Sequence, residues 1–486
     1  MSGAVAAHAA YNGSGTQGLA VTNKIHEDDG DVMSVFWNKN DTTRQLLFGS
    51  SVVEIPSSGA STLSYGSSRI FTINNDIDCV GDMYLQLTAK FPTYTLASTF
   101  GGVAPDNIGD QGANTVRTAL RARPFALQSI VERVEIQVGT QIWQTLESQD
   151  IRVVNSTELP ADGFSEMSML SSKTGAGITS TSAWLVIPSL TKTLGPRFGI
   201  FANQTEDGYP MAAAPHQSVK VKVYFKEFPT SLSYLPTTVG GSDGDVTVIQ
   251  FAEDVPLEGV ITVKGSIAST FAPAAAAGLT FTTGVSAAGS ITACNLYAKQ
   301  MVMCNEEREQ MKAMPAGLPK RLKMTQNAHV TDIGTSITKT IDLDHFSLYG
   351  SHLIISGNAG NDSNGNPIRI KTAELKLNSS SFSGQLPGVL LDSCTSDSLG
   401  IYANKFIHAD GSTFTVDEYG TGTYVFPLSA SAFSGSAVPL NRFDSIRLTL
   451  TFTSTPQNGG STFISVTCVG ETTALFKGGA ASLAMY

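Results

Sequence analysis

The segment Val134–Val138 (VEIQV) recurs later in the chain as Ala373–Leu377 (AELKL), with its glutamate displaced by 239 residues. The same displacement relates Trp184–Pro188 (WLVIP) to Thr423–Pro427 (TYVFP). In the first pair apolar and polar residues alternate, which is the pattern of a β-strand with one buried face. Because these patterns recur in the same order and at one spacing, the sequence predicts an all-β unit present twice in tandem.

A third pair of segments extends this repeat. Val219–Phe225 (VKVKVYF) and Ile446–Phe452 (IRLTLTF) alternate in the same way and lie 227 residues apart. The smaller offset indicates a shorter loop before the second copy. A period this long predicts two copies of a whole domain, because solenoid and propeller repeats have periods of about 20–50 residues.

The composition limits the class of protein. The chain has 486 residues, of which 41% are hydrophobic, enough for two or three domains with packed cores. Only 15% of the residues are charged, against roughly 25% in typical globular proteins. This low fraction favours a surface that neighbouring subunits partly cover. The net charge of −10 and the absence of any basic run longer than Lys320–Lys323 predict no direct binding of nucleic acid.

Cysteine usage and the N-terminus indicate a cytosolic origin. The five cysteines are scattered, odd in number and without a CxxC pair, which predicts free thiols in a reducing compartment. The first eight residues lack the basic and apolar regions of a signal peptide. The most apolar loop, Phe271–Leu279, is far too short to cross a bilayer. We therefore expect a soluble protein that is made in the cytosol.

The coarse pattern along the chain predicts many strands and one connecting helix. Ser129–Gln144 is typical of two strands around a turn at Gly139, and Thr145–Val153 of a short helix or an extended edge. Asn305–Lys312 lacks Gly, Pro and β-branched residues, which favours a helix, and Pro315 would stop it. Short strands joined by long loops favour antiparallel sandwiches or jelly rolls.

These patterns predict four parts. The fold class that we expect is all-β, with two tandem eight-stranded antiparallel jelly rolls and a short connecting helix. The first roll contains a long loop without a counterpart in the second, and insertions of this kind usually carry function. The expected parts are an N-terminal arm at 1–45, jelly roll 1 at 46–304 with its long loop at 230–290, a connector helix at 305–323 and jelly roll 2 at 324–486.

Five segments, taken in order, resemble the double jelly-roll major capsid proteins of large icosahedral DNA viruses, of the algal-virus and iridovirus type. Their strand-turn-strand motif, proline-ended strands, connector, closing strand and glycine-rich tail are similar to segments of this chain. These segments are Ile130–Ile142, Leu185–Pro188 with Tyr209–Met211, Asn305–Arg308 with Leu318 and Leu322, Tyr424–Pro427 with Asn441–Leu448, and Leu475–Ala484.

The resemblance implies a structural protein without a cofactor or an enzymatic activity. It implies a homotrimer whose six jelly rolls form a pseudo-hexagonal capsomer, and neighbouring capsomers that tile an icosahedral virion shell. Minor capsid proteins and an internal membrane beneath the shell, without insertion into it, are the other implied partners. The protein would be synthesised in the host cytoplasm and located in the capsid.

Two other functions remain open at this stage. A β-sandwich glycoside hydrolase would need two convergent carboxylates, and the paired acids are Asp76 with Asp78, Glu147 with Asp150, and Asp342 with Asp344. Their positions are typical of strand ends and turns, so we assign no catalytic residue. Asp342–His345 could ligate a metal, but an exposed strand edge is the favoured interpretation, and no metal or cofactor-binding residue is assigned.

The second alternative is a carbohydrate-binding tandem β-sandwich, such as a lectin-like attachment protein. Its aromatic platform would have to come from three tryptophans, Trp37, Trp143 and Trp184. Covalent sugar is a separate possibility, because six glycosylation sequons occur, at Asn12, Asn40, Asn155, Asn203, Asn361 and Asn378. Asn203 and Asn361, in expected loops, are the better candidates for glycosylation.

Overall fold

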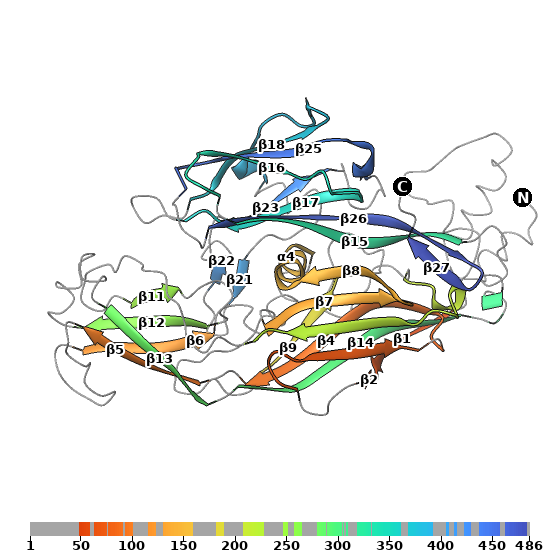
Figure 1. Cartoon of the computed structure of the whole chain (residues 1–486), viewed down its shortest axis with the longest axis horizontal. Helices are drawn as coiled ribbons and strands as arrows, with labels where there is room; N and C mark the ends of the chain where they lie inside the picture. The colour runs from red at the N-terminus through yellow and green to blue at the C-terminus, as the bar shows by residue number, and fades with distance from the viewer. Residues whose placement is uncertain are drawn as a thin grey trace, which may run out of the picture.

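The computed structural model has two β-sandwiches that lie one above the other, with strands in most of the chain (Figure 1). The expected N-terminal arm lies outside the described residues. The structure describes residues 48–58, 63–74, 76–90, 93–100, 115–122, 130–158, 181–188, 208–227, 246–250, 257–264, 279–287, 289–303, 305, 308–309, 318–331, 333–360, 368–391, 405–407, 413–415, 422–428, 437–456 and 462–483.

The first sandwich, roll 1, consists of two antiparallel sheets. Its four-stranded sheet has the order β1 (Phe48–Ile55), β14 (Ser290–Met303), β4 (Cys79–Lys90) and β9 (Thr181–Ile187). Its five-stranded sheet has the order β2 (Ser57–Ser58), β3 (Ser68–Ile73), β10 (Val219–Phe225), β7 (Val131–Val138) and β8 (Gln141–Glu147). Helix α4 (Ser148–Glu158) follows β8, and a 3-10 turn, Met211–Ala213, precedes β10.

The second sandwich, roll 2, repeats this arrangement. One sheet has the order β15 (Leu318–Thr331), β26 (Phe463–Lys477), β17 (Tyr349–Asn358) and β23 (Gly422–Pro427), with β24 (Val438–Pro439) and β27 (Ala480–Leu483) attached. The other has the order β16 (Thr338–Asp342), β25 (Ile446–Phe452), β18 (Ile370–Leu377) and β19 (Ser380–Ser381), with β20 (Leu386–Pro387) paired to β18. A 3-10 turn, Leu440–Arg442, precedes β25, and a hairpin is formed by β21 (Lys405–Ile407) and β22 (Thr413–Thr415).

The predicted repeat is confirmed, down to the register of strand pairing. β7 and β18 occupy equivalent places in their sheets, as do β9 and β23, and β10 and β25. In roll 1 Val221 lies opposite Ile136, and in roll 2 Leu448 lies opposite Leu375. These pairs are related by the offsets of 239 and 227 residues that the sequence shows.

Alternation explains why these segments form half-buried strands. Along β10 the four apolar residues are buried in the core of roll 1, and the three polar or aromatic residues between them are partly exposed. β25 has the same pattern, with its apolar residues in the core of roll 2. Gly139 has a φ of +62°, which suits glycine, at the expected turn between β7 and β8.

The expectation of a long loop at 230–290 is wrong in part, because this region contains three strands. β11 (Val246–Gln250) and β12 (Leu257–Lys264) form a sheet with β6 (Thr115–Ala122), and β13 (Leu279–Ala287) pairs with β5 (Thr93–Phe100). These strands lie together at one end of roll 1 (Figure 1). β6 and β5, the partners of β12 and β13, lie more than a hundred residues earlier in the chain, so local patterns could not reveal these two pairings.

The connector is shorter than its expected range of 305–323. Asn305, Arg308 and Glu309 are helical, but β15 already begins at Leu318. Pro319 is tolerated in this strand because β15 is at the edge of its sheet, where a missing N–H breaks no ladder on the open side. At Thr145–Val153 the chain forms the end of β8 and then α4, so the helical alternative holds from Ser148 onward.

Candidate assembly interface

A polar contact joins the start of α4 to roll 2. The carboxylate of Asp150, at the third helical position, accepts a hydrogen bond from the backbone N–H of Glu147 at 3.1 Å, as in a capping box. Its other oxygen accepts the hydroxyl of Thr467 on β26 at 3.2 Å. Beside it, Gln144 Nε2 donates to Thr325 Oγ1 on β15 at 2.7 Å. One cap therefore both starts the helix and connects the two rolls.

Burial governs the charge state of Asp150. Desolvation raises the pKa of this carboxyl from 3.8 to about 6, more than its hydrogen bonds to the Glu147 N–H and to Thr467 lower it. At neutral pH the carboxyl is therefore ionised, and burial of this charge costs folding free energy.

The apolar part of the same contact consists of two valines of α4 and three residues of roll 2. Val153 and Val154 form a buried cluster with Ile354, Val425 and Val469. Ile354 and Val425 are paired neighbours on β17 and β23. The residues on both sides of Ile354 belong to the core of roll 2, so Ile354 itself points out of that sandwich and toward α4. We call this contact, polar and apolar parts together, the inter-roll seam.

The polar residues of the same sheet face are also buried. Ser356, Thr423 and Ser465 have almost no exposed surface, although the outer face of an antiparallel sheet commonly meets water. His352 is buried too, and desolvation, with a smaller contribution from the charge of Lys323, lowers its pKa to about 3. This face of roll 2 is therefore part of the interior of the chain.

The C-terminal hairpin of roll 2 reaches over roll 1. Phe476 of β26 packs edge-on against Tyr209, with ring centroids 5.2 Å apart, and belongs to the core of roll 1. The backbone N–H of His216 donates to the Gly479 carbonyl at 3.1 Å, and the Ala481 N–H donates to the Gln217 side chain at 2.7 Å. The glycine-rich tail therefore holds the two rolls together.

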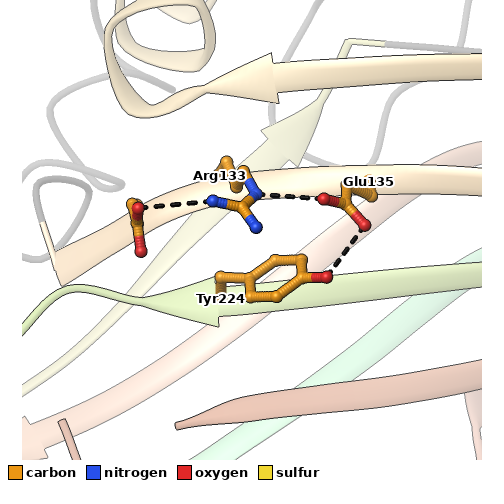
Figure 2. A network of polar contacts seen from close by, with 4 residues as sticks. Arg133, Glu135 and Tyr224 are labelled. Carbon is orange, nitrogen blue, oxygen red and sulfur yellow. Dashed lines mark hydrogen bonds and ion pairs between the residues drawn. The ribbon is translucent and has the colours of Figure 1, made fainter. Parts of the chain in front are cut away.

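A second polar cluster covers the outer face of β7 and β10 (Figure 2). Arg133 Nε donates to Glu135 at 3.0 Å, Tyr224 donates its hydroxyl to the other oxygen of Glu135 at 2.9 Å, and the Arg133 guanidinium lies 4.0 Å from the centroid of the Tyr224 ring. Glu132 completes the cluster at 3.4 Å. The hydrogen bond to Glu135 raises the pKa of Arg133 above its ordinary value. This face is charged and partly exposed, unlike the seam.

Four of the paired acids make structural contacts in the described part of the chain. Asp78 is held by Arg308, and Asp342 by Arg447 at 3.2 Å. Asp150 lies in the seam, and Asp344 accepts the Ile446 N–H at 2.6 Å. Among the described residues no group of three or more His, Cys, Asp or Glu side chains is placed to hold a metal ion.

The two candidate glycosylation residues, Asn203 and Asn361, lie outside the described residues. Two of the other sequon asparagines have structural tasks. Asn155 is buried in α4 and donates to the Val186 carbonyl at 3.0 Å, and Asn378 accepts the N–H groups of Asp444 and Ser445 at a turn. These contacts leave no room for a glycan at Asn155.

The aromatic platform of a carbohydrate-binding protein gains no support from Trp143. Its ring is buried edge-on against Tyr209, at 5.8 Å between centroids. Trp184 lies in β9, and Trp37 lies outside the described residues. No helix among the described residues is long and apolar enough to span a membrane.

Comparisons with solved structures agree with this architecture. The PBCV-1 protein VP54, fitted into a reconstruction of the virophage Sputnik, aligns with a TM-score of 0.58 over 94% of this chain and 99% of its own, at 10% identity. A PBCV-1 capsid chain aligns at 0.55 over 94% and 99%, at 12% identity, and the Faustovirus major capsid protein at 0.50 over 96% of each chain, at 9% identity. The chain has the double jelly-roll fold.

Sequence comparison adds nothing to this double jelly-roll assignment. No family model matches the chain, and no curated protein matches it. At about one identical residue in ten, the likeness is carried by strand order and spacing. Hydrophobic alternation and turns can persist when most individual residues differ, and these are the features that the internal repeat exposes.

Proposed function

We propose that this double jelly-roll protein is a structural major capsid protein, and that its mechanism is self-association rather than chemistry. The observation that supports this most strongly is the inter-roll seam, where one jelly roll buries the outer sheet face of the other within a single chain. A chain that joins two similar rolls side by side lets three copies present six similar units, and such a trimer can tile a nearly flat face.

The proposed assembly is a homotrimeric, pseudo-hexagonal capsomer in an icosahedral virion shell. Its other partners are neighbouring capsomers, minor capsid proteins and, beneath the shell, an internal membrane that the protein does not enter. Contacts within the trimer bury on the order of thousands of Å², and weaker contacts between trimers become strong by multivalency. The protein is made in the host cytoplasm and located in the capsid.

The same proposal assigns a role to each part of the chain. Residues 1–45 form the arm, 46–304 form roll 1, 318–486 form roll 2, and the connector lies between the two rolls. The strands β5, β6, β11, β12 and β13 at one end of roll 1 form the outer tower of the capsomer. Asn203 and Asn361 are the candidate positions for glycans. The charged outer face around Arg133 and Glu135 suits contacts that stay hydrated.

The solution mass tests this proposal. Light scattering of the purified chain should give three times 51.2 kDa, and negative-stain images of the same sample should show hexagonal outlines. A folded chain that stays monomeric at high concentration would contradict the capsomer. Binding to a sugar array by such a monomer would point to the carbohydrate-binding alternative.

A further inference from the structure

The outer sheet of roll 2 carries an uncharged patch of threonines. Its strands β16, β25 and β18 are neighbours, on the side of roll 2 away from roll 1 (Figure 1). The threonines alternate with core residues and are exposed or partly exposed: Thr338 and Thr340 on β16, Thr449 and Thr451 on β25, and Thr372 on β18. Strand pairing aligns Thr338, Thr451 and Thr372 in one row. In the next row the hydroxyls of Thr340 and Thr449 are 3.4 Å apart. We call these five residues the threonine patch.

Ion pairs border the threonine patch at one end. The same strand pairing aligns Asp342, Arg447 and Lys376 in the row that follows Thr340 and Thr449. Arg447 Nε lies 3.2 Å from the Asp342 carboxylate, and Lys376 Nζ lies 3.6 Å from that of Glu374. Protein–protein interfaces have this composition, because charged residues are depleted from their centre and polar groups lie at their rim.

The equivalent sheet face of roll 1 has long side chains instead. At the repeat offsets, Thr449 corresponds to Lys222, Thr451 to Tyr224 and Thr372 to Arg133. The fold therefore accepts long and charged side chains at these positions, and the strands do not themselves require threonine. A β-branched threonine has few rotamers to lose when another surface covers it, whereas lysine and arginine lose many. The threonine patch is thus the outer sheet face that can be covered at the lower entropic cost.

We infer that the threonine patch is a two-fold docking surface for a second copy of this chain. The contact is isologous, so that the same patch takes part on both sides. Two sheets that pack face to face keep their strand directions within about 30° of each other. A two-fold axis parallel to β25 places β16 of one copy over β18 of the other, and the threonine rows of the two copies then meet.

The charges at the border of the patch fit this arrangement. Because β16 lies over β18, Asp342 of each copy faces Lys376 of the other, which gives two acid–base contacts across the interface. Arg447, on the central strand, lies near the axis and keeps the ion pair with Asp342 of its own chain. A second copy therefore complements both the uncharged centre of the patch and its charged border.

A contact through one three-stranded face is small and should be weak by itself, because stable complexes bury more than about 1,200 Å² in total. In the shell proposed above, many copies of a weak contact act together. The patch then joins neighbouring trimers and does not hold a single trimer together. This role rests on the proposed function, whereas the pairing of two patches can be tested without it.

The mass of the full-length chain over a range of concentrations tests the contact. Light scattering of the wild type should give three chains when dilute and a rising mass when concentrated. Thr449→Lys introduces the residue that roll 1 has at the equivalent position, but it brings two lysines together near the axis. T449K should need at least ten times the concentration for the same rise. Gln137→Lys adds the same charge to the equivalent face of roll 1, and this control should keep the wild-type rise.

A charge exchange tests the two-fold arrangement. Asp342→Lys and Lys376→Asp should each weaken the concentration-dependent association, with unchanged circular dichroism, and the double variant should restore it. Asp342 and Lys376 lie on strands that β25 separates, so the restoration arises between copies and not within one chain. A double variant that associates no better than either single variant would overturn the inferred contact.

The inferred contact and the proposed function fail separately in these measurements. A wild type that stays at three chains at every concentration would overturn the contact and leave the trimer standing. A wild type that is monomeric when dilute and dimeric when concentrated, with T449K monomeric throughout, would contradict the trimer and support the contact. Equal association of the wild type and T449K would overturn the contact whatever the mass of the dilute chain.

Discussion

Arg308, in the connector, binds both carboxylate oxygens of Asp78 at the start of β4, through Nε at 2.6 Å and Nη2 at 2.8 Å. Asp78 is buried and 230 residues away along the chain, whereas Arg308 is partly exposed. The geometry is the two-pronged pairing that a guanidinium offers and an ammonium does not. The segment that leads from one roll to the other is therefore fixed to the first roll by a charge pair with one buried member.

Replacing this guanidinium should destabilise the chain because Asp78 would keep a buried charge without its bidentate partner. Arg308→Ala should lower the urea midpoint of unfolding several-fold more than Arg447→Ala, whose partner Asp342 is exposed. Arg308→Lys should recover only part of the loss. Equal midpoints for R308A and R447A would show that the connector pair contributes no more than a surface ion pair.

The seam should make stability depend on pH through Asp150. Burial raises the pKa of this carboxyl from 3.8 to about 6, so the folded chain binds more protons than the unfolded chain between those values. Stability is therefore lost as the pH rises from about 4 to about 6, by up to about 3 kcal/mol. Asp150→Asn keeps an oxygen for the Glu147 N–H and carries no charge, so it should be the more stable form at pH 7.

The difference between wild type and D150N, measured by urea unfolding at several pH values, isolates this carboxyl from the others. It should grow between pH 4 and pH 6 and then stay constant. A difference for D150N that is independent of pH would contradict the buried carboxyl.

Truncating Ile354 tests whether the outer sheet face of roll 2 is buried against α4 or exposed to water. It points away from the core of its own roll, yet it is fully buried in the seam. Ile354→Ala should therefore cost about 2–4 kcal/mol of unfolding free energy, as a core truncation does. Ile337→Ala, at a half-exposed isoleucine, should cost less than about 1 kcal/mol. Similar small losses for both would mean that the two rolls are not packed together in solution.

The repeated strands could be predicted from the sequence because each one shows the alternation of apolar and polar residues within its own segment. Val219–Phe225 and Ile446–Phe452 alternate, so their faces and their equivalence can be found without knowledge of any partner. The seam has a weaker local signal. In β17 the run Leu353–Ile355 does not alternate, and a continuous apolar run indicates a strand that is buried on both faces. What covers the second face, α4, could not be predicted, because its contact residues lie about two hundred residues earlier.

Contacts between residues far apart in the chain could not be predicted from the sequence for the same reason. The sequence indicated ordinary strand-end or turn positions for Asp78 and Asp150, because Arg308 and Thr467, which contact them, are 230 and 317 residues away. The region 230–290 was interpreted as a long loop because β12 and β13 pair with β6 and β5, more than a hundred residues earlier. Local patterns identify elements, and the contacts between elements that form the candidate interface need the folded chain.

Two neighbouring glycines of the C-terminal hairpin, Gly478 and Gly479, allow the cost of close packing to be measured apart from the cost of an unfavourable backbone conformation. Gly478 and Gly479 both have positive φ, +62° and +77°. A Cβ at Gly479 would lie 2.4 Å from the His216 ring of roll 1, whereas one at Gly478 would meet nothing within 4 Å. Gly478→Ala should therefore cost about 1 kcal/mol for the backbone alone, and Gly479→Ala about 2 kcal/mol or more. Urea unfolding of the two variants measures the difference, and equal losses would show that the hairpin does not contact roll 1 as closely as the structure indicates.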